Sequence, residues 1–319
     1  MLNKYIYFVT IAEELSISKA AQKLFISHQG LSLYLKNLEE HYGVTLLQRQ
    51  PKFALTEAGK RLLEFYRQVE FMDKNLIAQF KDMKNEVHGT VNLGIVEGRY
   101  RIMVPLILKE YRDMYPNVKL NVHNDASWNL KKRLLDNELD LFLSTGIERA
   151  PKNDKIKREV LVEEDLHIVV SDNVLQNIFT EQTAEKKAEF QSKGIDLKQM
   201  GDLPFMLPAK NFTSRIMLDE YLQEHNLQLN IIMESMHPDI HHLLAGMDYA
   251  ASTCLSMYCK GIRERNKSVP PGGSQLNTFK VRDMKRKSVV KLNSLNGAIF
   301  PKYIKDLQEL IKRICLEER

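Results

Sequence analysis

Two clusters of side chains have residue types that could bind a metal or change redox state. His237, His241 and His242 include a pair four residues apart, which would share one helix face. No carboxylate or cysteine stands at ligand spacing beside them, so a solvated or hydrogen-bonded histidine cluster is favoured over a metal site. Cys254 and Cys259 are five residues apart and form no Cys-x-x-Cys motif, which favours buried structural cysteines over a redox switch. We expect no metal and no cofactor.

A second set of residues could bind an anion. Arg99 and Arg101 follow a buried-type strand and precede a helix, and Arg215 lies near the start of a later helix. The planar guanidinium matches carboxylate or phosphate, and helix N-termini add partial positive charge. The other candidate residues beside these arginines are Gly98, Ser127, Trp128, Thr213 and Ser214.

These residues predict a small anionic, aromatic effector, with Ser127 as a hydrogen-bonding group and Trp128 as a stacking wall. Two alternatives stay open. The arginines could form surface ion pairs, with Glu97 as the local partner of Arg101, and Trp128 could serve packing alone.

A third set of residues, near the N-terminus, could contact DNA. In a predicted helix from Ser27 to Tyr42, Leu31, Leu35 and Leu38 recur at helical spacing and form the buried face, which leaves a polar face opposite. Polar side chains on such a helix can reach base edges in the major groove. We expect Ser27 to cap the end of the helix that faces the DNA groove, His28, Gln29, Ser32 and Leu33 to contact bases, and Lys36, Arg49 and Lys52 to contact phosphates.

The elements around this third set predict a winged helix-turn-helix domain over residues 1–58. Ser16 is a plausible N-cap before a short helix of small residues, and Gly43 ends the next helix. Two short strands, 44–49 and 53–56, then form a wing. Residues 1–67 hold nine Lys and Arg against six Asp and Glu, so more than half of the net charge of +5 lies in this first fifth of the chain. That clustering favours phosphate contacts.

Residues 59–89 predict one long linker helix. Its apolar residues repeat at close to 3.5 residues, a seam that requires a partner helix. They are Leu62, Phe65, Tyr66, Val69, Met72, Leu76, Phe80, Met83 and Val87. We expect this seam to pair two chains; packing on its own domain is the alternative.

From residue 90 to 319, strand-like runs alternate with helical ones, which predicts a two-lobed α/β domain. Residues 160–164 predict the first crossover between lobes, and the proline and glycine run at 270–273 marks a second between 268 and 281. We therefore assign lobe I to 90–162 and 276–319, and lobe II to 163–275. Because ligands bind at the carboxyl ends of strands in such sheets, the site is expected between the lobes.

Composition and motifs narrow the function further. The 319 residues are 44% hydrophobic and 27% charged, as in ordinary globular proteins, and the longest apolar runs are far too short to span a membrane. Glu13 and Glu14 interrupt any signal peptide, which predicts a cytoplasmic protein. No Gly-x-Ser-x-Gly, P-loop or dinucleotide-binding motif occurs, so we expect no enzyme. The alternative function, an enzyme or solute-binding protein with an incidental helix-turn-helix-like domain, needs a catalytic constellation or an export signal.

Read in order, these motifs resemble the LysR-type transcriptional regulators along essentially the whole chain. The resemblance is carried by Phe8-Val9, by the run from Ser16 to Leu24, by Leu31-Ser32, by Leu46 to Arg49, and by Leu55 to Gly59. It is thinner in the second half, at Gly94, Pro105, Tyr115-Pro116, Leu139 to Leu141 and Ala245-Gly246.

The resemblance implies a bacterial regulator, activator or repressor, that binds double-stranded DNA and a small-molecule effector. It implies an α+β multi-domain fold with a winged helix-turn-helix, a linker helix and a periplasmic-binding-protein-like effector domain. It also implies a homodimer that pairs into a tetramer. The chain departs from the family pattern at Gly30 and Leu33 in the recognition helix, and a longer, more polar segment stands at 176–199.

Overall fold

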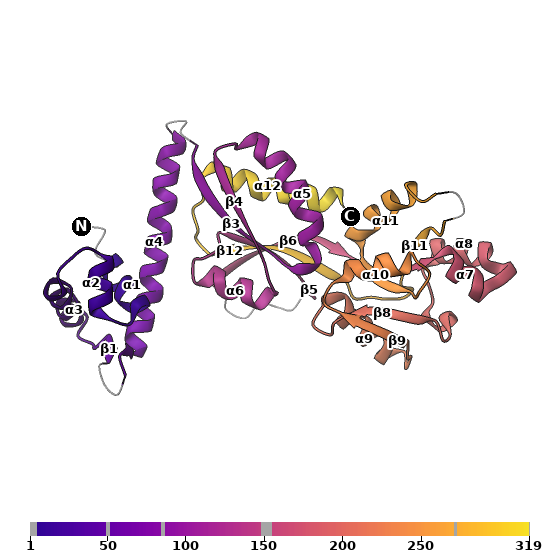
Figure 1. The fold of residues 1–319 in the computed structure, drawn as a ribbon, viewed down its shortest axis with the longest axis horizontal. Coiled ribbons are helices and arrows are strands. Elements are labelled where there is room, and N and C mark those ends of the chain that lie inside the picture. The colour runs from indigo at the N-terminus through magenta and orange to yellow at the C-terminus, as the bar shows by residue number, and fades with distance from the viewer. Residues whose placement is uncertain (1–4, 49–51, 84–86, 148–154, 271–272, 319) are drawn as a thin grey trace.

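The computed structural model describes residues 5–48, 52–83, 87–147, 155–270 and 273–318. A small helical domain, a long helix and two lobes follow one another along the molecule (Figure 1). None of the helices in these ranges is long and apolar enough to cross a membrane. The predicted α+β architecture is confirmed.

The N-terminal domain is a winged helix-turn-helix. It consists of α1 (Tyr5–Glu14), α2 (Ile17–Lys23), α3 (His28–Tyr42), β1 (Leu47–Gln48) and β2 (Ala54–Leu55). The predicted caps are confirmed: the Ser16 hydroxyl accepts from Lys19 N–H, the Ser27 hydroxyl accepts from Gly30 N–H, and Gly43 ends α3 at φ 66°. These caps fix where α2 and α3 begin and where α3 ends.

The core of this domain is formed by apolar residues from all three helices and the segment before the wing, among them Phe8, Ile11, Ala20, Ala21, Leu31, Leu35 and Leu46. The Glu39 carboxylate of α3 accepts hydrogen bonds from the N–H groups of Leu46 and Leu47 at 2.7 and 3.2 Å. Because these two hydrogen bonds join α3 to the start of β1, they fix the wing relative to the recognition helix.

The linker helix α4 runs over Glu57–Met83. It begins two residues earlier than predicted because the Thr56 hydroxyl accepts from Gly59 N–H, as an N-cap does. The last described residue of the helix is Met83, and residues 87 and 88 are not helical, so the helix ends before the predicted residue 89. Val87 packs against the core of lobe I instead of continuing the seam.

Lobe I is built on a five-stranded sheet in the order β4-β3-β5-β12-β6. The strands are β3 (Gly89–Ile95), β4 (Val118–Asn124), β5 (Leu141–Gly146), β6 (Ile156–Glu164) and β12 (Ser288–Leu295). β3 is parallel to β4 and β5, and β12 is antiparallel to both of its neighbours. The helices are α5 (Glu97–Met114), α6 (Ser127–Leu135) and α12 (Lys302–Glu317).

Lobe II holds the sheet β10-β7-β11 and the parallel pair β8-β9, joined by a bridge between Phe205 and Ala251. The strands are β7 (Leu166–Ser171), β8 (Pro204–Pro208), β9 (Asn230–Ser235), β10 (Ser252–Leu255) and β11 (Leu276–Lys280). The helices are α7 (Asp172–Phe179), η2 (Thr180–Gln182), α8 (Thr183–Lys193), η3 (Leu197–Met200), α9 (Thr213–Glu224), α10 (Pro238–Ala245) and α11 (Ser256–Lys267).

The lobe boundaries need correction. All of β6 pairs with β12 in lobe I, and β7 begins at Leu166, so the first crossover is the single residue Asp165 instead of 160–164. β11 pairs with β7, which places residues 276–280 in lobe II and not in lobe I as predicted. The chain returns to lobe I between Lys280 and Ser288. The proline and glycine run at 270–273 precedes β11, which is a strand of lobe II. This break in regular structure therefore does not mark the second crossover between the lobes.

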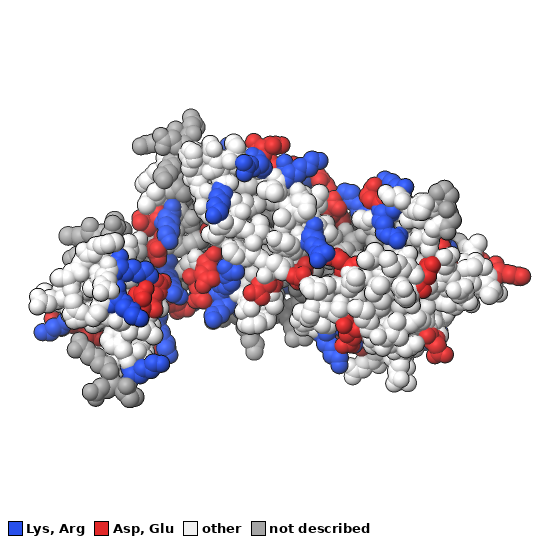
Figure 2. All heavy atoms as spheres, in the orientation of Figure 1, with Lys and Arg blue, Asp and Glu red and all other residues white. Residues whose placement is uncertain are grey.

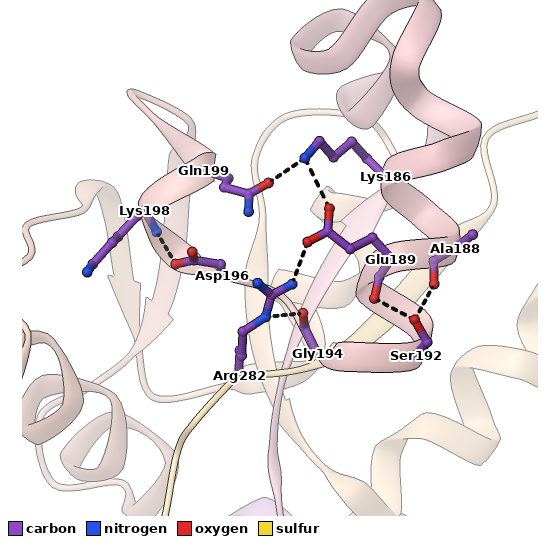
Figure 3. A network of polar contacts seen from close by, with 9 residues as sticks. All are labelled: Lys186, Ala188, Glu189, Ser192, Gly194, Asp196, Lys198, Gln199 and Arg282. Carbon is purple, nitrogen blue, oxygen red and sulfur yellow. Dashed lines mark hydrogen bonds and ion pairs between the residues drawn. The ribbon is translucent and has the colours of Figure 1, made fainter.

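The long polar segment 176–199 folds as part of lobe II. It extends from α7 through η2 and α8 into η3. Glu189 of α8 accepts from Arg282 at 2.8 Å and from Lys186 at 3.0 Å, and Arg282 also donates to the Gly194 carbonyl at 3.1 Å (Figure 3). These ion pairs lower the pKa of Glu189 to about 2. The segment is thereby attached to the strand connection that leads back to lobe I.

Candidate functional site

The exposed surface of α3 carries the predicted DNA contacts. His28, Gln29, Leu33 and Lys36 are exposed and Ser32 is half-buried, while Leu31 and Leu35 of the same helix are buried in the core. The first turn of α3, which Ser27 caps, therefore exposes the side chains of His28 and Gln29 to solvent. Lys36 lies 3.7 Å from Glu40 in an exposed pair that solvent screens.

Charges around α3 and the wing are mixed in sign. Figure 2 shows Lys and Arg side chains at the helix-turn-helix end of the molecule with acidic side chains among them. Lys23 pairs with Glu14, and Arg61 lies near Glu57. Lys52 on the wing is exposed, and Arg49 lies outside the described residues.

The linker helix α4 exposes a stripe of large apolar side chains, which we call the α4 stripe: Phe65, Met72, Leu76, Ile77 and Phe80. Other faces of α4 are covered, since Leu62 belongs to the core of the helix-turn-helix domain and Phe71 packs edge-on against Phe300 of lobe I. Four predicted seam residues therefore stay accessible within one chain. An exposed apolar stripe at this spacing is typical of a helix that pairs with another helix.

A cavity of about 500 Å³ lies between the two lobes. Six of the eight predicted effector residues line it: Gly98, Arg99, Ser127, Trp128, Thr213 and Ser214. The other two, Arg101 and Arg215, are not among its lining residues. Apolar and aromatic side chains form most of the remaining wall, including Val96, Phe212, Met236, Leu255, Met257 and Tyr258.

Four helices begin at this cavity. The N-cap residues Val96, Ala126, Phe212 and Leu255, of α5, α6, α9 and α11, all line it, and none of their side chains makes a cap hydrogen bond. Gly98, Arg99 and Arg101 thus lie within the first turns of α5 and not on a preceding loop, as the sequence suggested.

Arg99 is already paired with a carboxylate. It is 3% exposed and forms an ion pair with Glu164, which is itself 2% exposed. The Arg99 Nε donates to Thr145 Oγ1 at 2.6 Å, and Glu164 also accepts from the N–H of Met257 at the start of α11. The pair therefore joins α5 of lobe I to the first turn of α11 in lobe II.

Arg101 and Arg215 also have carboxylate partners. Arg215 is buried and bonds to Asp219 at 2.7 Å and to Glu234 at 2.6 Å within lobe II. Arg101 lies 2.9 Å from Asp239 of α10, instead of pairing with Glu97, its expected local partner. Glu97 lies 3.5 Å from His237. Neither arginine points a free guanidinium at the cavity.

Several lining residues were not predicted from the sequence, and Thr253 on β10 is the most informative of them. It is 1% exposed, lines the cavity, and its hydroxyl has no hydrogen-bond partner. Tyr258 was missed as well, although its hydroxyl donates to the Gly98 carbonyl across the lobes. The strand end at Leu255 was the signal that could have identified both residues, since cleft residues cluster where strands end.

The histidine and cysteine clusters have ordinary partners. His241 is buried and bonds through Nε2 to the Ser235 hydroxyl at 2.9 Å; burial lowers its pKa to about 4. All three cysteines are buried and unpaired by disulfides. A hydrogen bond with Cys254, with His167 beside it, lowers the pKa of Cys259. Within the described ranges, no group of three metal-ligating side chains comes together.

A winged helix-turn-helix joined by a helix to two lobes with a cavity defines a DNA-binding protein with a separate ligand-binding domain. Two family models match the chain. Residues 2–60 match the bacterial regulatory helix-turn-helix protein, lysR family, and residues 84–245, about half the chain, match the LysR substrate binding domain. The chain belongs to the LysR family: it is a LysR-type transcriptional regulator with a DNA-binding and an effector-binding domain.

Curated relatives agree with this assignment. An uncharacterized HTH-type transcriptional regulator of Bacillus subtilis, YkuM, is 28% identical over 50% of this chain and 54% of its own length, so the match spans about half of that protein. A probable RuBisCO transcriptional regulator of Thalassiosira pseudonana is 27% identical over 71% of this chain and 72% of its own.

Solved structures share the fold. A full-length OxyR variant from Pseudomonas aeruginosa has a TM-score of 0.65 at 17% identity, with 98% of this chain and 94% of that chain covered. Full-length CbnR in complex with its target DNA has a TM-score of 0.53 at 16% identity, with 98% and 99% covered.

Proposed function

We propose that this regulator binds its operator through the first turns of α3 and changes its DNA binding when a small molecule occupies the cavity between the lobes. The exposed polar surface of the capped α3, on a domain whose α1 packs against α4, is the observation that carries this proposal. His28, Gln29, Ser32 and Leu33, with Ser27 at the helix start, are the proposed base readers.

Phosphate contacts are assigned to Lys36, Lys52 and Arg49. The Lys52 side chain is exposed on the wing, the element that lies beside the backbone in winged helix-turn-helix complexes. These contacts would supply affinity without sequence preference.

We infer that the α4 stripe pairs two chains. Two helices that cover each other's stripe would remove its large apolar side chains from water and place two recognition helices about 34–36 Å apart, or a multiple of that distance. Further pairing of dimers into a tetramer is part of the same proposal.

The effector would act by stabilising one relative arrangement of the lobes. Gly98, Arg99, Ser127 and Trp128 line the cavity from lobe I, and Thr213 and Ser214 line it from lobe II. A ligand that contacts both walls has different affinities for open and closed arrangements, which a population shift requires. The cavity therefore serves ligand binding and not catalysis in this proposal, and the protein acts in the cytoplasm with its DNA.

A mobility-shift titration of the full chain against the DNA that flanks its own gene tests this function. We expect retardation of that DNA at concentrations where an unrelated fragment of equal length and base composition stays free. Equal affinity for both fragments across a range of salt concentrations would contradict a sequence-specific regulator.

A further inference from the structure

Charged groups of both signs surround the cavity between the lobes, and they limit the class of molecule it can hold. Arg99 is the only lysine or arginine among its described lining residues, and Glu164 already compensates that charge. Glu97 and Asp125 add two carboxylates to the wall. With histidine counted as neutral, the lining side chains together with Glu164 carry a net negative charge.

The helix starts oppose this negative charge. A helix N-terminus carries about half a positive charge, so the four that open onto the cavity together offset about two carboxylates. An anion would meet Glu97 and Asp125 and would have to displace Glu164 from Arg99. A cation would meet the four N-termini. Neither sign of charge is favoured, because desolvating a charge without a free counter-charge is costly.

A buried polar atom points to what the ligand must offer. Thr253 lines the cavity and its hydroxyl is buried with no partner, whereas the Thr213 and Thr145 hydroxyls are engaged within the protein. A buried hydroxyl without a hydrogen bond is unfavourable, and native structures normally satisfy it through protein, water or ligand. Thr253 can donate and accept, so a hydroxyl, carbonyl or amide group would satisfy it.

We propose that the cavity takes an uncharged, mainly apolar small molecule that bonds to Thr253 through one hydroxyl, carbonyl or amide group. The rest of the molecule would pack against Phe212, Met257 and Tyr258, under Trp128. This inference rests on the proposed function, since it names the class of effector for that same cavity. It replaces the anionic effector expected from the arginines alone.

Trp128 makes the proposal directly measurable. It is the only tryptophan of the chain, lines the cavity, and is 71% exposed, so its fluorescence reports a molecule that covers it. The full chain is titrated with four phenylpropyl compounds of one skeleton: hydrocinnamyl alcohol, hydrocinnamamide, hydrocinnamate and phenylpropylamine. Equilibrium dialysis of the same compounds gives an independent affinity.

We expect the alcohol and the amide to shift the Trp128 emission to shorter wavelength and to half-saturate at a concentration at least about tenfold lower than the carboxylate or the amine. Thr253→Val should weaken binding of the amide about threefold to tenfold, the range of one neutral hydrogen bond. Ser252→Ala is the matched control: Ser252 is the preceding residue on β10, equally buried and equally unpartnered, and does not line the cavity. It should leave binding unchanged.

Equal or tighter binding of the carboxylate or the amine would overturn the proposal, and so would a failure of both neutral compounds to bind. Unchanged amide affinity in Thr253→Val would also overturn it; if that variant does not fold, Thr253→Ser must keep the preference for the neutral compounds. DNA mobility shifts on the same samples separate the two proposals. Neutral ligands that bind without altering DNA binding would contradict the effector role and leave the ligand class standing. If the neutral compounds bind no more tightly than the charged ones while DNA binding is intact, the ligand class alone would be contradicted.

Discussion

Arg99 in the first turn of α5 and Glu164 at the end of β6 form a buried ion pair at the junction of the two lobes. Glu164 also accepts from Met257 N–H, so one carboxylate holds the starts of α5 and α11 together. The pair thus neutralises the one arginine among the described residues of the cavity wall and connects the lobes at their crossover.

Removal of the negative partner should be strongly destabilising. Glu164→Gln leaves the Arg99 charge buried without compensation, which costs about 3–5 kcal/mol. Urea unfolding monitored by circular dichroism measures this loss. Glu110→Gln is the matched control, because Glu110 pairs with Arg313 in an exposed position, and it should cost about 1 kcal/mol or less. Equal losses in both variants would show that burial of the Arg99 pair has no energetic consequence.

Base and phosphate contacts should respond differently to substitution. Gln29→Ala should relax preference at one operator position and cost about 1–3 kcal/mol there. Lys52→Ala should weaken binding to all sequences alike and reduce the slope of log affinity against log salt by about one. Mobility shifts with operator variants at several salt concentrations measure both effects. Lys109→Ala, exposed on α5 of lobe I, is the control and should change neither. A changed sequence preference in Lys52→Ala with an unaltered salt slope would reverse the assignment.

Charging the α4 stripe should separate the chains. Met72→Asp combined with Leu76→Asp would bury unpaired carboxylates in the proposed helix pair, so the dimer should dissociate. Light scattering measures the mass in solution. Leu108→Asp, an equally exposed apolar position on α5, is the control and should keep the wild-type mass. An unchanged mass in the double variant would exclude the α4 stripe as the dimer interface.

His241 should make the protein less stable in mild acid. Burial and the neighbouring His242 lower its pKa to about 4, although Asp239 opposes this shift. The folded state therefore binds fewer protons than the unfolded state below about pH 6.5, and stability falls as pH decreases from about 6.5 to about 4.

The difference between wild type and His241→Gln isolates this contribution, which is on the order of 2–3 kcal/mol between those pH values. The comparison matters because burial raises the pKa of Asp140 to about 6, a shift that stabilises the folded state as pH falls and so opposes the effect of His241. Urea unfolding at several pH values provides the data. His28→Gln, at an exposed position of α3, should follow the wild-type curve; parallel curves for all three proteins would disprove the role of His241.

The sequence by itself determined the elements whose signals are local. The spacing of Leu31 and Leu35, the cap at Ser27 and the glycine at 43 specify α3, its buried face and its ends, because each of these interactions spans a few residues of one helix. The apolar repeat of residues 62–80 likewise predicted the α4 stripe. Six of the eight predicted effector residues do line the cavity, since strand ends and helix starts meet at one edge of such a sheet.

Only the tertiary structure decided what these residues contact. Arg99 reads in sequence as a free cation, and its partner Glu164 is 65 residues away. Thr253 lies in a buried strand like any core residue, and only the folded chain places it at the cavity wall and leaves its hydroxyl without a partner. Strand β11 was assigned to the wrong lobe for the same reason, because pairing with β7 is a contact across more than 100 residues. Caps and periodicity act over one or two turns, whereas charge compensation and hydrogen-bond satisfaction depend on distant segments that meet only in the folded chain.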